Sequence, residues 1–258
     1  MSEVSYRPLI EDMTFSYSRL TCFEDCRYRW FLKYIHGARD EPLFYSSFGS
    51  FMHSLIQRYY MGLIAKDDLP RVFLEEFTSS VQGKRPPGET VSKYIHDGLS
   101  YFRAFEPFPF SPVATERRLS FEVNGLKFVG FLDFLGEKDG EYYIVDHKSH
   151  NLKPRSKRSK PTQNDLEIDR MLRQLYLYAE GVRQAFGKYP KALCFNCFRS
   201  NTFITEPFDR QAHQSAISWA TTLAASIMDE SDFHPTIDFF PCTYLCPVSH
   251  ACEYFSGN

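Results

Sequence analysis

The sequence predicts an α/β fold, in which helices flank a central mixed β-sheet. Three observations support this class: apolar residues recur at helical spacing through the first 105 residues, residues 115–148 carry strand and hairpin patterns, and a long helical pattern returns at 165–186. A chain of 258 residues can form one large domain, and we expect a single domain over residues 1–258.

Four helices are predicted before the sheet. The first enters at Thr14 or Ser16, residue types that cap helices, and its apolar spacing continues to residue 36. The others cover 46–64, 67–82 and 91–105, and two prolines and a glycine at 86–88 separate the last two. Further prolines end this half, so we interpret 65–112 as a helical insertion that could cover a cleft.

The middle of the chain predicts a β-hairpin and a third strand. Residues 115–123 and 126–135 flank Asn124-Gly125, a strong two-residue turn, and a second turn at 138–140 leads into a strand at 141–148. A basic loop follows. The remaining elements are a helix at 165–186, strands at 191–199 and 202–208, a helix at 209–229 and a loop-like, cysteine-rich tail.

Composition indicates the setting of the protein. The net charge of -2 gives no global argument for nucleic-acid binding, and no run of about 18 apolar residues predicts a membrane span. Residues 1–7 lack a signal-peptide pattern, so we expect a cytoplasmic protein without a membrane partner. Its seven cysteines are expected to be reduced thiols or metal ligands. Cys194 and Cys197 lie three apart in an apolar strand and are expected to be buried thiols on opposite faces.

Two carboxylates stand at the ends of predicted buried strands. Asp133 closes one apolar run, and Asp146 closes another that continues into His147 and Lys148. Either aspartate alone is commonly a cap or turn residue. Together, two acceptors and an ammonium at the rim of a core suit a divalent metal ion and a phosphodiester. Strand alternation points the His147 side chain away from Asp146 and Lys148.

Other polar residues have two readings each. His53 is either a core histidine or a metal ligand, and Gly49 before it is expected to allow close helix packing. Gln174 and Tyr178 share a helix face and either pack or orient a phosphate or a water molecule. Glu116 is a second-tier partner near the site.

A basic run and a cysteine cluster complete the set of candidates. The run at 153–160 is either a solvated loop or a phosphate-binding segment. The tail spacing C-x₃-C-x₅-C supplies Cys242, Cys246 and Cys252, and a four-thiolate site needs a fourth ligand, for which Cys22 and Cys26 are candidates. Four thiolates can hold a [4Fe–4S] cluster or Zn²⁺.

The order and spacing of these motifs resemble the PD-(D/E)XK nucleases, and most closely the RecB-like branch, which includes the AddB nuclease domain and the CRISPR-associated Cas4 proteins. The resemblance runs from about Ser16 to Cys252 and implies a restriction-endonuclease-like core. The motifs that carry it are Gly49-x-x-x-His53, Gly130-Phe131-Leu132-Asp133, Asp146-His147-Lys148 and Gln174-x-x-x-Tyr178.

The resemblance implies roles for these residues. His53, Asp133, Asp146 and the backbone carbonyl of His147 would bind Mg²⁺ or Mn²⁺, which would polarise the scissile phosphate and lower the pKa of a bound water. Lys148 would hold that water or offset charge in the transition state. Asp146 stands where the family often has Glu, a change that also occurs in the RecB-like branch.

The resemblance also assigns the cysteines. Cys26 matches the first ligand of the iron–sulfur subset, so a [4Fe–4S] cluster would join residue 26 to Cys242, Cys246 and Cys252 as a structural staple. The tail has one residue more than the usual C-x₂-C-x₅-C. Zinc is the alternative occupant.

The expected function is that of a metal-dependent DNA exonuclease acting on single-stranded or frayed ends, in recombination, repair or phage DNA processing. A Cas4-type CRISPR adaptation nuclease and a non-catalytic iron–sulfur DNA-binding module are the alternatives. The intact catalytic residues argue against the second. No helicase motif is present, so a helicase or a recombination or CRISPR partner would be a separate chain. Expected phosphate contacts are Arg155, Lys157, Arg158 and Lys160.

Overall fold

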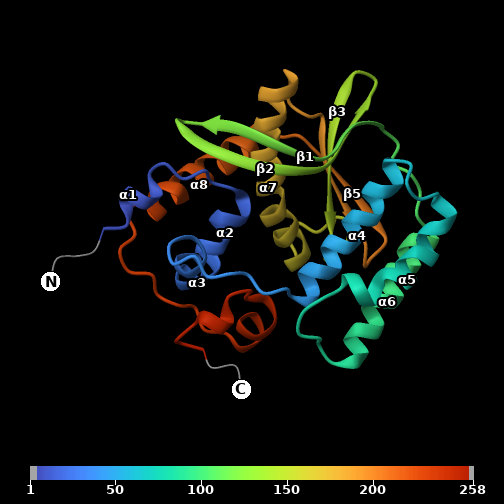
Figure 1. Cartoon of the computed structure of the whole chain (residues 1–258). Helices are drawn as coiled ribbons and strands as arrows, with labels where there is room; N and C mark the ends of the chain where they lie inside the picture. The colour runs from blue at the N-terminus through green and yellow to red at the C-terminus, as the bar shows by residue number, and fades with distance from the viewer. Residues whose placement is uncertain (1–4, 256–258) are drawn as a thin grey trace.

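A five-stranded mixed β-sheet with helices on both faces forms the centre of the computed structural model (Figure 1). The structure describes residues 5–255, so the two ends of the predicted single domain, 1–4 and 256–258, lie outside the described residues. The α/β class is confirmed. No helix among residues 5–255 is long and apolar enough to cross a membrane.

The sheet has the order β1-β2-β3-β4-β5. The first three strands pair antiparallel, β4 pairs parallel to β3 after the crossover helix α7, and β5 returns antiparallel along β4. Their bounds are β1 (Ser111–Val123), β2 (Leu126–Lys138), β3 (Glu141–Lys148), β4 (Ala192–Cys197) and β5 (Thr202–Pro207).

The helices divide between two cores. One sheet face is covered by α7 and α8 and by α2 and α3 from the N-terminal segment, and a separate aromatic core joins α4, α5 and α6. Figure 1 shows α5 and α6 beside α4 and away from α7. The bounds are α1 (Arg7–Ile10), α2 (Tyr17–Asp25), α3 (Arg27–Tyr34), α4 (Phe44–Tyr60), α5 (Leu69–Ser80), α6 (Gly88–Arg103), α7 (Gln163–Phe186) and α8 (Arg210–Met228).

The predicted helix over 14–36 is wrong in one respect, because the structure divides it at Cys26. That residue is extended, with φ -161° and ψ 109°, so it ends α2 and caps α3, and its sulfur accepts a hydrogen bond from the Arg29 N–H at 3.4 Å. The apolar spacing continues through the break, which is why the sequence shows a single helix. The turn directs the Cys26 sulfur toward the tail, where the Thr236 N–H lies 3.4 Å away.

The helical insertion packs against α4, and its role as a cover for the cleft stays a prediction. Its buried residues, among them Phe73, Phe77 and Phe102, pack with the apolar face of α4 and with Phe198. The pocket beside Lys148 is lined by α2, α7 and the residues at the end of β3. Burial of its apolar faces therefore explains where the insertion lies.

Candidate metal and nuclease site

The pairing of β2 with β3 brings the two predicted aspartates together. Phe134 pairs with Val145 in this antiparallel register, so Asp133 and Asp146 occupy the next positions on adjacent strands. Asp133 Oδ2 accepts a hydrogen bond of 2.7 Å from the backbone N–H of His147. The carboxylates thus meet at the end of the paired segment, as the resemblance implied.

Helix α4 adds His53 to this edge of the sheet. Its Nδ1 lies 3.5 Å from Asp133 Oδ1 and 3.6 Å from Glu116 Oε1, while its Nε2 lies 3.2 Å from the carbonyl oxygen of His147. Among residues 5–255, His53, Glu116 and Asp133 form the one group of three potential ligands whose atoms all lie within 4.8 Å of one another.

Glu116 was expected to be a second-tier partner near the site, but its carboxylate is one of the three potential ligand groups. It has a φ of 46°, which few residues other than glycine adopt and which marks an irregular point in β1. No local pattern signals this conformation. The one available signal was the position of Glu116 at the start of the predicted hairpin strand.

The protonation states fit a cation at this donor set. Burial opposes a charge on His53, but its contacts with Asp133 and Glu116 raise its pKa to about 10. Burial alone would raise the pKa of Asp133. The contact with His53 and the hydrogen bond from the His147 N–H have the larger effect, so the pKa of Asp133 is lowered. Without a metal, a protonated imidazole supplies the positive charge that the two carboxylates require. A divalent ion could take its place, since imidazole and carboxylates are suitable ligands for it.

Asp146 lies next to this group and is tied to Lys148. Its Oδ2 is 2.7 Å from Lys148 Nζ, in an orientation that leaves this buried oxygen without a well-directed hydrogen bond. Burial raises the pKa of Asp146 although Lys148 opposes the shift. A buried acceptor with unused capacity fits an additional ligand at this point.

The predicted pair on α7 joins Lys148. Gln174 Oε1 accepts a hydrogen bond of 2.8 Å from Lys148 Nζ, and Gln174 Nε2 donates one of 3.2 Å to the Tyr178 hydroxyl. Gly130 on β2 leaves room for the Tyr178 ring, which a β-carbon would overlap. The pair thus holds the ammonium group in place.

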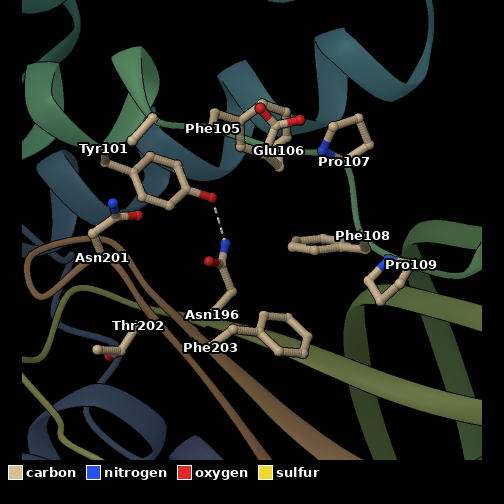
Figure 2. Close-up of a pocket in the computed structure, with 11 residues that line it drawn as sticks. Tyr101, Phe105, Glu106, Pro107, Phe108, Pro109, Asn196, Asn201, Thr202 and Phe203 are labelled. Atoms are coloured by element: carbon tan, nitrogen blue, oxygen red, sulfur yellow. Dashed lines mark hydrogen bonds between the residues drawn. The ribbon is translucent and has the colours of Figure 1, made fainter.

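His147 turns its side chain to the other sheet face, as predicted. Asn196 Nδ2 lies 3.2 Å from its Nδ1 and donates a hydrogen bond of 2.7 Å to the Tyr101 hydroxyl. Burial lowers the His147 pKa to about 3, so the ring is neutral. Asn196 and Tyr101 line a cavity of about 300 Å³ together with Phe108 and Phe203, and Figure 2 shows Asn196 between Tyr101 and Phe203.

Four cysteines line one pocket near the N-terminal segment: Cys26, Cys242, Cys246 and Cys252. Cys22 is buried elsewhere and accepts a hydrogen bond from Arg29 Nε at 3.4 Å. Of the two N-terminal candidates, the structure brings Cys26 to the tail cysteines. Cys194 and Cys197 are buried in different cores on opposite faces of β4, as predicted.

The basic loop divides into two kinds of residue. Arg155 is half-buried and makes ion pairs with Glu206 at 2.8 Å and Asp169 at 2.6 Å. Lys157, Arg158 and Lys160 are exposed. Three of the four predicted phosphate contacts are therefore accessible, whereas Arg155 already has two carboxylate partners.

Gly49 does not allow close helix packing, so that expectation is wrong. A β-carbon built there would meet Ser149 Oγ at 3.9 Å, an ordinary van der Waals separation. Glycine inside a helix costs about 1 kcal/mol relative to alanine. No packing contact at this position requires glycine in place of alanine.

Comparison with known proteins defines the class. The family model of the PD-(D/E)XK nuclease superfamily matches residues 14–253. The chain belongs to this superfamily, and membership implies metal-dependent nuclease chemistry.

Two solved structures are similar to the chain. One is a Eubacterium rectale protein titled "Putative exonuclease", with 16% sequence identity, a TM-score of 0.56, and coverage of 99% of this chain and 94% of that one. This likeness supports the fold. The other, SSO0001, has 17% identity, a TM-score of 0.27, and coverage of 74% and 96%, a likeness too weak to support an argument. A comparison with curated proteins found no match.

Proposed function

We propose that this protein is a DNA exonuclease of the RecB-like branch that uses Mg²⁺ or Mn²⁺ and acts on single-stranded or frayed ends. The observation that carries the proposal is the group of His53, Glu116 and Asp133, with Asp146 and Lys148 beside it. Oxygen-rich donors with one imidazole suit these ions. A bound divalent ion would supply Lewis-acid activation of the phosphate and of water.

The side chains have separate roles in this proposal. Asp133, Asp146, His53 and the carbonyl of His147 would hold the ion, and we add Glu116 as a further ligand or as an acceptor for His53. Lys148 would position the attacking water and offset charge on the phosphate, because Gln174 and Asp146 fix its ammonium group at 2.8 and 2.7 Å. Tyr178 would keep Gln174 in place through its hydroxyl.

The cysteine pocket supports a [4Fe–4S] cluster as the second cofactor. Zn–S bonds of about 2.3 Å would place the sulfurs of a tetrahedral zinc site about 3.8 Å apart. Among the described cysteines, no three have sulfurs within 4.8 Å of one another. We take the cluster as the occupant because the resemblance implies it, with zinc as the alternative. The cluster would act as a structural staple between residue 26 and the tail.

A nuclease assay tests the proposal. DNA labelled at either end, single- or double-stranded, should be shortened stepwise from an end with Mg²⁺ or Mn²⁺, and chelation should stop the reaction. Asp133→Ala protein serves as the control for contaminating nuclease. Intact DNA under all these conditions would contradict the proposed activity, and internal cuts alone would contradict an exonuclease.

A Cas4-type role in CRISPR adaptation involves the same chemistry, and no feature of the site favours it. A non-catalytic iron–sulfur DNA-binding module is disfavoured by the assembled Asp133, Asp146 and Lys148. Binding of DNA without cleavage in the assay above would support that alternative. Cytoplasmic location and a separate helicase partner remain part of the proposal.

A further inference from the structure

One face of α4 connects the metal site to a partly exposed aromatic cluster. Tyr45, Gly49 and His53 are spaced four residues apart and therefore lie in a row along the helix. His53 ends this row at the carboxylates of the metal site. Tyr45, the second residue of α4, begins it.

Gly49, in the middle of the row, leaves a space that the protein does not fill. Gly98 and Gly181, which lie in the interiors of described helices, are required by packing: a β-carbon at Gly98 would meet the Phe73 ring at 2.6 Å, and one at Gly181 would meet Phe121 at 2.8 Å. At Gly49 the nearest such atom, Ser149 Oγ, is 3.9 Å away. A helical glycine without a packing reason points to the close approach of a ligand.

The aromatic cluster consists of Tyr45, Phe240 and Tyr244. The Phe240 ring lies 6.1 Å from that of Tyr45 and 5.4 Å from that of Tyr244, and Phe240 is 48% exposed. Lys84, itself exposed, places its Nζ 5.5 Å from the centre of the Tyr244 ring. A partly exposed aromatic surface beside a cation is suited to bases and phosphates of a single strand.

We propose that one DNA strand runs along this face of α4, with its backbone over Gly49 and a base stacked on the aromatic cluster. This inference rests on the proposed nuclease function. Eight helical residues span about 12 Å, which corresponds to roughly three or four nucleotides at the stacked spacing of about 3.4 Å. The stacked base must be unpaired, so the cluster selects single-stranded over duplex DNA near the cut.

Substitution of Gly49 tests the space over the helix. Gly49→Ala should leave the thermal unfolding midpoint unchanged or raise it, because alanine favours the helix and meets no close neighbour. It should lower kcat/KM on single-stranded DNA at least tenfold. Gly88→Ala is the matched control, since a β-carbon at that first residue of α6 also meets nothing within 4 Å. It should cleave like the wild type.

Substitution of Phe240 tests the stacking. Phe240→Ala should weaken binding of a single-stranded oligonucleotide, measured without metal by fluorescence anisotropy, by roughly 5- to 150-fold, the range for one lost stacked base. Phe240→Tyr should retain binding. A series of oligonucleotides would each lack one base, at one of the first five positions from the cut. At one of these positions, the missing base should weaken binding by the wild type but should not weaken binding by Phe240→Ala any further.

The outcomes separate this inference from the proposed function. Wild-type protein that cleaves DNA, together with Gly49→Ala and Phe240→Ala variants that cleave and bind equally well, would overturn the strand path alone. Equal effects of the abasic site at every position would also overturn it. Wild-type protein that neither binds nor cleaves DNA but acts on RNA would overturn both.

Discussion

At the scale of single residues, Glu116 is the member of the metal site that the local sequence pattern did not identify as a ligand. It has a positive φ, but its neighbours Thr115 and Arg117 pair with Phe134 and Leu132, so the β1–β2 register places it opposite Asp133 and near His53. Asp133 and Asp146 meet through the β2–β3 register. The irregular residue and the regular ones contribute to the same centre. Their substitutions should therefore have related but unequal effects.

Loss of the ligands should remove activity without unfolding the chain. Asp133→Ala should abolish cleavage and Mn²⁺ binding, measured by titration calorimetry. Glu116→Gln should lower activity by about 10- to 100-fold, the range for a supporting ligand. Glu122→Gln, on the same strand and exposed, is the control and should behave as wild type. Wild-type metal affinity in Glu116→Gln would remove Glu116 from the site.

Lys148→Ala should strengthen the dependence of stability on pH that Asp146 causes, because Lys148 opposes the rise in the Asp146 pKa. The folded-state pKa of Asp146 is raised above its unfolded value, so stability falls as pH rises from about 4 through the raised pKa. Removal of Lys148 leaves a buried carboxylate unpaired, at a cost of roughly 3–5 kcal/mol above that pKa. Thermal unfolding with chelator at pH 5 and pH 8 measures this loss.

The double variant Lys148→Ala with Asp146→Asn is the control for this prediction. It removes the charge together with its partner and should recover most of the stability lost at pH 8. Equal destabilisation of Lys148→Ala at both pH values would show that lost packing, rather than charge, is responsible.

At the scale of elements, the contact of β2 with α7 holds the site together. Gly130 admits the Tyr178 ring, and Tyr178 in turn supports Gln174 and Lys148. Gly130→Ala should destabilise the fold by about 1–3 kcal/mol through overpacking and should lower kcat, as urea unfolding and initial rates would show. Tyr178→Phe keeps the ring and should lose activity with little loss of stability. A stable, fully active Gly130→Ala would contradict this coupling.

The basic loop should show two separate effects. Neutralising the exposed Lys157, Arg158 and Lys160 together should weaken DNA binding and lower the slope of log K against log salt by about one unit per lost contact. Arg155→Ala should mainly lower stability, because its side chain joins Glu206 on β5 to Asp169 on α7. An unchanged salt slope in the triple variant would show that the loop is solvated and makes no phosphate contacts.

At the scale of the whole molecule, the tail lies against the N-terminal segment far from it in sequence. Backbone hydrogen bonds join Tyr28 to His234 and Glu41 to Pro247, at 3.3 and 2.8 Å, and the Cys26 sulfur lies at the same junction. Figure 1 shows this tail below α3 and near the start of α4. A cluster there would close a loop of more than 200 residues.

The cysteine variants test this junction. Anaerobically purified wild-type protein should contain about four iron atoms per chain. Cys26→Ala, Cys242→Ala, Cys246→Ala and Cys252→Ala should each lose iron and stability, because the staple no longer restricts the unfolded chain. Cys22→Ala should retain iron, since its sulfur lies outside the cysteine pocket. One zinc ion and no iron in anaerobic protein would contradict the cluster.

The sequence by itself determined the features that depend on neighbouring residues. The Asn124-Gly125 hairpin, the strand that ends at Lys148, the long helix α7 and the side to which His147 points all follow from turn chemistry and from periods of two and 3.6. The pairing of Asp133 with Asp146 follows from those strands, so the core of the candidate site was also predictable.

Only the tertiary structure decided the features that depend on distant residues. The break at Cys26, the positive φ at Glu116, the ion pairs of Arg155 and the open space at Gly49 each result from contacts, or a lack of contacts, with segments remote in the chain. Local propensity cannot indicate them, because the free energy that selects each conformation comes from partners that folding brings together.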